Sequence, residues 1–196
     1  MRPRLARLKR VLNTLRDDPF KAITRSVDVT RAQLFLFGCA LGTGVCASGA
    51  LRVVGPGRIH VGDRVTFVGG VTPTELICHP GGALIIGEES LFNYGVSVES
   101  HGAVTIGRRC MLASYVRICD GARDGPRPIT IEDDVWLAHG VIVEPGVTIG
   151  AGSVVSAGSV VTRDVLPGSL AAGNPARCMS LNLAAPVAAH TAPRFS

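Results

Sequence analysis

Aromatic side chains are scarce in this sequence of 196 residues: Phe, Trp and Tyr together make up 5% of it. This scarcity argues against a surface that stacks nucleic-acid bases, although the formal net charge is +5. Part of that charge is local, because six of the twenty Lys and Arg residues lie within residues 1–16. The composition is that of one soluble domain with a core of small aliphatic side chains.

Cysteine pairs and strongly apolar runs are also missing. The six cysteines form no CxxC motif and no cleavable signal peptide precedes them, so we predict reduced, buried thiols in a cytoplasmic protein. Residues 32–50 contain no charge and are long enough to be a membrane span. Their many small side chains make them weakly hydrophobic, so we expect this run to lead into β structure instead.

Residues 3–16 show the spacing of an amphipathic helix, because their leucines recur every three or four positions among basic residues. Such a helix could dock weakly on an anionic membrane surface, but the apolar stripe is narrow, and packing against the main body is favoured. We expect a helical entry segment over residues 1–50, a repeat domain over residues 51–166 and a C-terminal extension over residues 167–196.

The 24 glycines and 12 prolines fall at regular intervals between aliphatic residues, which is typical of turns in a repetitive all-β structure. A six-residue repeat predicts a parallel β-helix with three short strands in each coil of about eighteen residues. The aliphatic residues at a spacing of six are Ile131, Leu137, Val143, Ile149, Val155 and Val161, and the same pattern occurs at Ile86, Phe92, Val98, Ile106, Leu112 and Ile118.

Two insertions interrupt the repeat, after Val98 and after Ile118, and both leave the coil at the same corner. Equivalent positions of successive coils lie about 4.8 Å apart, so counting along the coils assigns neighbours. His101 is predicted to project near Asp120. A second set of neighbours should form one ladder: Tyr94, Ser114, His139 and Ala157.

Two blocks resemble the hexapeptide-repeat O-acetyltransferases, especially the maltose/galactoside and the capsule or exopolysaccharide enzymes. They are residues 131–177, IEDDVWLAHGVIVEPGVTIGAGSVVSAGSVVTRDVLPGSLAAGNPAR, and residues 92–118, FNYGVSVESHGAVTIGRRCMLASYVRI. The resemblance implies a left-handed β-helix that forms a homotrimer. It also implies three active sites between subunits, acetyl-CoA as the acyl donor and a hydroxyl of a sugar, a polysaccharide unit or a natural product as the acceptor.

The resemblance also assigns individual residues. The family's CoA contacts fall on His139, Ala157, Thr162, Arg163 and Arg177. The two arginines suit the phosphates of CoA, and the alternative is that they are solvated charges at coil ends. On the acceptor side, Asn93 stands where the family has an asparagine, and His101 replaces an acidic residue. His139 replaces a small residue, which favours acetyl over bulkier acyl groups.

The histidine that serves this family as general base, a role worth about 10²–10⁴-fold, is missing. Its aligned position is Arg123, in the segment ICDGARDG of residues 118–125, and arginine stays protonated in proteins. We consider a relocated base, a β-helix that has become a binding or assembly module, and a cleft with different chemistry. The intact CoA motif favours a relocated base. We prefer His139 as the base or as a thioester-orienting residue, and give His101 with Asp120 an acceptor-side role.

The other histidines are interpreted as surface residues: His60 and His79 in irregular early coils, and His190 in an Ala/Pro-rich tail. No metal site is expected, because only His101 and His139 lie in regular coils, and they lie on different corners. Trp136 and Tyr115 are predicted to pack near the cleft between subunits.

Overall fold

The structure, a computed structural model, describes residues 19–180. The helix predicted over residues 3–16 and the histidine at position 190 lie outside these residues. The described part begins with helix α2 (Pro19–Phe35) and continues in strands joined by turns and loops, and the strands form three sheets.

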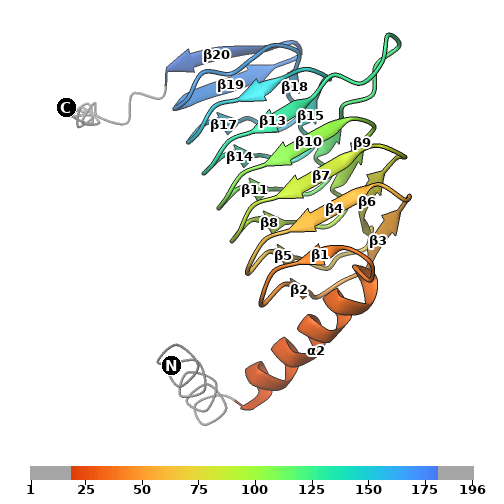
Figure 1. Cartoon of the computed structure of the whole chain (residues 1–196). Coiled ribbons are helices and arrows are strands. Elements are labelled where there is room, and N and C mark those ends of the chain that lie inside the picture. The colour runs from red at the N-terminus through yellow and green to blue at the C-terminus, as the bar shows by residue number, and fades with distance from the viewer. Residues whose placement is uncertain (1–18, 181–196) are drawn as a thin grey trace, which may run out of the picture.

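The strands follow one another from sheet A to sheet B to sheet C, so three strands complete one coil (Figure 1). Sheet A contains β1 (Ala40–Leu41), β4 (Arg58–Val61), β7 (Ala83–Ile86), β10 (Ala103–Ile106), β13 (Ile129–Ile131) and β16 (Thr148–Ile149). Sheet B contains β2 (Cys46–Ala47), β5 (Thr66–Phe67), β8 (Leu91–Phe92), β11 (Met111–Leu112), β14 (Trp136–Leu137), β17 (Val154–Val155), β19 (Ser169–Gly173) and β20 (Ala176–Ser180). Sheet C contains β3 (Leu51–Val54), β6 (Thr74–Cys78), β9 (Ser97–Ser100), β12 (Arg117–Cys119), β15 (Ile142–Val143) and β18 (Val160–Val161).

This arrangement is a parallel β-solenoid of roughly six turns, consistent with the left-handed β-helix that was predicted. Every ladder pair is parallel except β19 with β20. The aliphatic residues at a spacing of six fill the interior, and each is at most 1% exposed. The register also confirms the predicted columns, because Leu112 pairs with both Phe92 and Leu137, and Ile118 pairs with both Val98 and Val143.

The solenoid is longer than the repeat pattern predicts at both ends. It begins at Ala40, before the expected boundary at residue 51. After Pro167 the chain returns to sheet B, where β19 pairs with β17 and buries Ala171, and β20 then folds back antiparallel on β19 in the same sheet. The uncharged run of residues 32–50 is shared between the end of α2 and the first two strands. Within residues 19–180 no helix is both long and apolar enough to cross a membrane.

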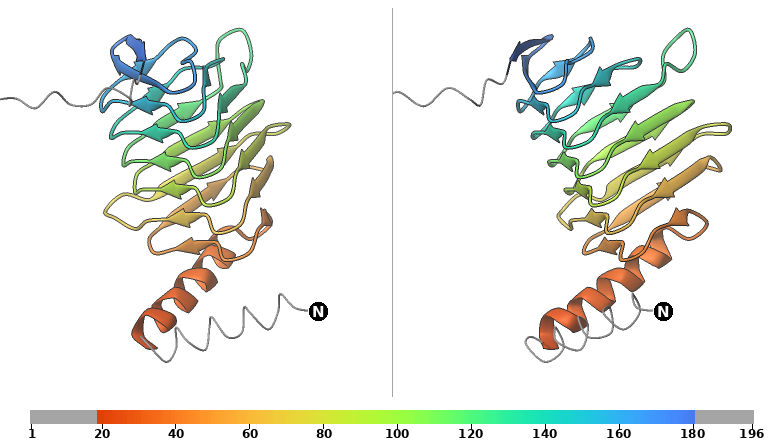
Figure 2. Two further views of the ribbon diagram at one scale, coloured as in Figure 1. Left: turned by 90° about the vertical axis from the view of Figure 1, so that its left-hand side faces the viewer. Right: turned by 60° about the vertical axis from the view of Figure 1, so that its left-hand side comes forward.

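The C-terminal part of helix α2 packs against the N-terminal end of the solenoid, and the rest of the helix projects away from it (Figures 1 and 2). Its Ala32 and the adjoining Leu36 are almost completely buried and belong to the same apolar cluster as the coil interior. An open end of a β-helix would expose core residues to water, so this contact removes apolar surface from solvent.

The three corners of the coil are named here by the sheets they join. The first corner joins sheet A to sheet B, the second joins B to C, and the third joins C to A. Both insertions lie at the third corner as predicted, between β9 and β10 and between β12 and β13. The second of these forms the projecting loop of residues 120–128 (Figure 2).

Candidate functional site

The structure divides the predicted site residues between two corners. His139 and Ala157 lie on the second corner, after β14 and β17, whereas His101 and Asp120 lie on the third, after β9 and β12. Sheet C separates the two corners, so a single chain does not bring the two groups together.

The ladder predicted on the second corner is present. Main-chain hydrogen bonds join its successive members: Tyr115 N to Tyr94 O at 3.3 Å, Gly140 N to Ser114 O at 3.0 Å, and Gly158 N to His139 O at 2.8 Å. One side-chain contact reinforces it, because Ser114 Oγ lies 2.9 Å from His139 Nδ1. That hydrogen bond fixes the imidazole and leaves its Nε2 available to a ligand.

Tyr115 packs beside His139 on this corner. Its ring centroid lies 5.5 Å from that of His139 and 5.6 Å from that of Tyr94, both in edge-on arrangements, and its hydroxyl lies 3.2 Å from Thr72 Oγ1. His139 and Ala157 themselves are exposed. The second corner therefore offers an ordered but accessible imidazole beside a small residue.

His101 and Asp120 are neighbours on the third corner as predicted, but the contact is not between ring and carboxylate. Asp120 is completely buried, and its two oxygens accept hydrogen bonds from the main-chain N–H groups of His101, Gly102 and Ala103 at 2.6, 2.9 and 2.7 Å. Asp120 thus holds the corner of the preceding coil in place. Among the hydrogen bonds and ion pairs of residues 19–180, none joins the Asp120 carboxylate to the imidazole of His101.

The carboxylate that does reach His101 is Glu99, which the sequence analysis missed. Glu99 Oε1 lies 3.1 Å from His101 Nε2 and 2.8 Å from His79 Nε2. The hydrogen bond from His79, followed by that from His101, holds the pKa of the Glu99 carboxyl below its ordinary value. His79 was expected in an irregular coil, but it follows β6 directly and stacks on His101, with ring centroids 3.9 Å apart.

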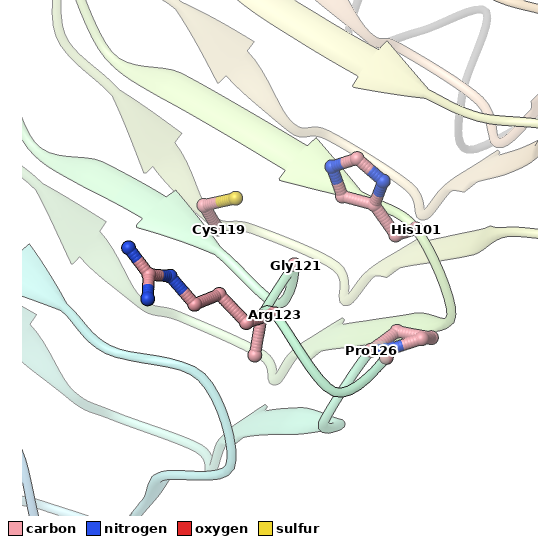
Figure 3. Close-up of a pocket in the computed structure, with 7 residues that line it drawn as sticks. His101, Cys119, Gly121, Arg123 and Pro126 are labelled. Carbon is pink, nitrogen blue, oxygen red and sulfur yellow. The ribbon is translucent and has the colours of Figure 1, made fainter.

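His101 also lines an open depression of about 540 Å³ beside the loop of residues 120–128 (Figure 3). Cys119, Gly121, Arg123 and Pro126 line it as well. Arg123, to which the resemblance assigns the position of the family's histidine, therefore lines this depression together with His101. Its guanidinium can bind an anionic or hydroxyl-rich ligand there but cannot accept a proton.

Three of the four remaining predicted residues lie on the surface, and the fourth is half-buried. Thr162 and Arg163 follow β18 on the third corner, and Arg177 lies in β20. All three are exposed. Asn93 is half-buried on the second corner, and its Oδ1 accepts a hydrogen bond from Tyr94 N at 2.8 Å. The structure does not bring these residues into one cluster within a single chain.

Comparisons with known proteins agree with the hexapeptide repeat. A family model described as "Bacterial transferase hexapeptide (six repeats)" matches residues 128–163, a segment that includes His139, Ala157 and Arg163. A Schizosaccharomyces pombe protein named "Putative acetyltransferase" is 42% identical over 102 residues. That alignment covers 46% of this chain and 49% of that protein, so the chain spans about half the length of this curated relative.

Solved structures of acetyltransferases are also similar to this chain. A hexapeptide-repeat-containing acetyltransferase from Vibrio cholerae is 28% identical, with a TM-score of 0.55 over 79% of this chain and 81% of that one. A galactoside acetyltransferase in complex with coenzyme A is 27% identical, with a TM-score of 0.53 over 79% of this chain and 71% of that one. The resemblance to the hexapeptide-repeat acetyltransferases is therefore confirmed.

Proposed function

We propose that this protein transfers an acetyl group from acetyl-CoA to a hydroxyl of a sugar, a polysaccharide unit or a natural product. One observation carries the proposal: the ordered imidazole of His139 and the small Ala157 share an exposed corner inside the segment that matches the transferase repeat. The similarity to a galactoside acetyltransferase in complex with coenzyme A supports both the donor and the class of acceptor. The six free thiols support a reducing, cytoplasmic location.

The proposal includes a homotrimer, because each chain carries the two halves of the site on different corners. A neighbouring subunit would supply the third corner, with Arg123 and His101, opposite the second corner with His139. The outer face of sheet B supports such an assembly, since its outward residues form an apolar stripe. We define the apolar stripe as Leu91, Met111, Trp136, Val154 and Leu170, which are register partners on successive coils.

In this proposal the cationic side chains of Arg163 and Arg177 bind the phosphates of CoA. Both are exposed, and an arginine fork matches phosphate oxygens in charge and geometry. Thr162 adds a hydroxyl next to Arg163. The pantetheine arm would follow the coils towards Ala157, where the absence of a larger side chain leaves the main chain accessible.

His139 is the proposed base. If its Nδ1–H donates to Ser114 Oγ, Nε2 carries the lone pair and can take the acceptor hydroxyl proton. The acceptor oxygen then bonds to the thioester carbonyl carbon, the bond from carbon to sulfur breaks, and the departing CoA sulfur receives the proton. Asn93 and His101 are proposed to orient the acceptor, whereas Asp120 contributes by holding the main chain at His101 in place.

The experiment compares His139→Ala and His101→Ala with the wild type in an acetyl-transfer assay, together with calorimetric binding of a non-hydrolysable CoA thioether. We expect His139→Ala to lower turnover by at least ~10²-fold while it leaves CoA affinity nearly unchanged. His101→Ala should raise the acceptor KM more than it lowers turnover.

Two outcomes would redirect the proposal. Full turnover in His139→Ala excludes His139 as the base. Absence of CoA-thioether binding at millimolar ligand favours the alternative function, a β-helix that serves as a binding or assembly module. The feature behind that alternative is Arg123, at the position to which the resemblance assigns the family's catalytic histidine.

A further inference from the structure

Three potential metal-ligating side chains meet on the third corner, outside the proposed CoA site: His79, Glu99 and His101. Their ligand atoms all lie within 4.8 Å of one another. The side chains of His79, Glu99 and His101 are 39%, 27% and 35% exposed, so an ion can reach them from solvent. The repeat pattern predicts no metal site, because it leaves His79 outside the regular coils.

The fold holds the two imidazoles in matching positions. Leu76 pairs with Val98, and each histidine lies three residues beyond one of these buried residues. Their rings stack with an interplanar angle of 13°. On its other side, His101 packs against Gly121, where an added Cβ would lie 2.7 Å from His101 Cδ2. Three successive coils therefore hold these side chains together. Because the stacked rings are nearly parallel, both must turn out of the stack before their Nε2 lone pairs can point at one ion.

The distances also suit a shared ion. Zinc binds imidazole nitrogen and carboxylate oxygen at about 2.0–2.2 Å, which places two ligands of one ion about 2.8–3.5 Å apart. Both histidine nitrogens lie within or close to that range of the same oxygen, at 2.8 and 3.1 Å. A histidine pair with one carboxylate is a ligand set that zinc accepts, whereas Mg²⁺ and Ca²⁺ prefer oxygen alone.

We propose that His79 Nε2, Glu99 Oε1 and His101 Nε2 form a zinc site. Three protein ligands leave a fourth position for water or for an oxygen of a bound molecule. Because His101 also lines the depression of Figure 3, a ligand in that depression would lie beside the ion. This inference does not depend on acetyl transfer, since it concerns residues outside the proposed CoA site and is tested by metal binding alone.

The competing interpretation uses the same geometry without an ion. Each imidazole would donate its Nε2–H to Glu99, and the cluster would be a hydrogen-bonded corner contact. The two interpretations differ in one measurable respect. A hydrogen-bonded contact needs no metal, whereas a zinc site requires both nitrogens to be free of protons and gives the folded chain additional stability when the ion binds.

The test uses the full chain without an affinity tag, treated with EDTA and then titrated with zinc chloride in a calorimeter. We expect about one zinc ion per chain in the wild type and in His60→Ala, a matched control whose exposed imidazole on β4 lies outside the cluster. Glu99→Gln and His79→Ala should each weaken zinc binding by at least ~10-fold.

Two further measurements exclude other sources of binding. Cobalt substitution should give a spectrum without thiolate charge-transfer bands, because none of the six cysteines is a proposed ligand. Zinc should raise the melting temperature of the wild type and of His60→Ala but not of the cluster variants. If Glu99→Gln does not fold, His79→Ala and His101→Ala decide the matter. Zinc binding that is absent in the wild type, unchanged in the cluster variants or accompanied by thiolate bands overturns the proposal.

Discussion

At the scale of single residues, Asp120 shows how a correctly predicted neighbour can have an unexpected role. Counting equivalent positions along successive coils places Asp120 beside His101, and the structure confirms this proximity. Counting cannot tell whether a side chain bonds to a ring or to the main chain, because that depends on its rotamer. Here the carboxylate accepts hydrogen bonds from three main-chain N–H groups. Its principal effect should therefore be on the free energy of unfolding.

Replacing Asp120 should therefore destabilise the protein. We expect Asp120→Ala to lower the free energy of unfolding by about 2–4 kcal/mol, since buried donors without an acceptor are costly. Denaturant titration measures the effect. The matched control is Asp124→Ala, an exposed acid in the same loop, which should stay within about 0.5 kcal/mol of the wild type. Equal stability of the two variants would contradict this assignment.

Glu99 and His79 were missed for different reasons. Glu99 points outward from β9 between two buried residues, and nothing in a single sequence separates it from other outward charges. The position of His79 could have been predicted, because it lies three residues past Leu76, as His101 lies three residues past Val98. The signal was lost because residues 51–85 repeat less regularly, which obscured the pairing of Leu76 with Val98.

At the scale of elements, four successive coils place charged residues of alternating sign at the first corner, where the flanking coils have Gly44 and Gly152. Arg64, Glu89, Arg109 and Asp134 occupy the left-handed region with φ of 57°, 60°, 53° and 60°, where side chains other than glycine are strained. Arg64 bonds to Glu89 at 2.6 Å and Arg109 to Asp134 at 2.7 Å. Arg108 and Asp133 add a parallel pair at 2.7 Å. These contacts between coils offset part of the backbone strain.

The corner pairs predict a dependence of stability on pH. The Arg108 side chain, followed by its main-chain N–H, lowers the pKa of Asp133, and Arg109 lowers the pKa of Asp134. A carboxyl whose pKa is lower in the folded state stabilises the fold above its unfolded pKa, about 3.9, and loses this contribution as pH falls through the folded value. The pairs should therefore stabilise the protein at neutral pH and fail in acid.

The variant Asp133→Asn with Asp134→Asn should melt at a lower temperature than the wild type at pH 7, and the difference should shrink as the pH falls below about 4. Added salt should also reduce it, because these groups are exposed. Calorimetric melting at several pH values measures this. As a control, Asp124→Asn should show no such trend. A constant difference across the whole pH range would mean that packing, not charge, is responsible.

At the scale of the whole molecule, the regular part of the solenoid could be predicted and its ends could not. The aliphatic residues at a spacing of six fill a repeating interior, so their positions follow from the geometry of one coil. The first coil consists of short strands after α2, and the last contains β19. At both ends the repeat pattern weakens, because α2 at one end and the β19–β20 hairpin at the other cover the core in place of a further coil. End structures depend on such single contacts, which no repeat encodes.

The remaining prediction is that the protein forms a homotrimer, and substitutions in the apolar stripe test it. Met111 and Trp136, register partners on the outer face of sheet B, are 48% and 47% exposed in the single chain. Among the described residues, the outward side chains of sheet A are small or polar, and Ile85 is a large apolar exception at 46% exposed. If three chains bury the apolar stripe, removing Met111 and Trp136 from water stabilises the trimer. A glutamate at either position would bring a carboxylate into the interface, and its desolvation would oppose assembly.

We therefore expect light scattering to give three times the mass of one chain for the wild type and a single chain for Met111→Glu with Trp136→Glu. The matched control, Ile85→Glu, carries the same change at a similarly exposed position on sheet A and should remain trimeric. Because the proposed site combines the second corner of one subunit with the third corner of another, the monomeric variant should also lose acetyl transfer while circular dichroism still shows a folded β-helix. A monomeric wild type would refute the trimer. Dissociation by Ile85→Glu alone would move the interface to sheet A.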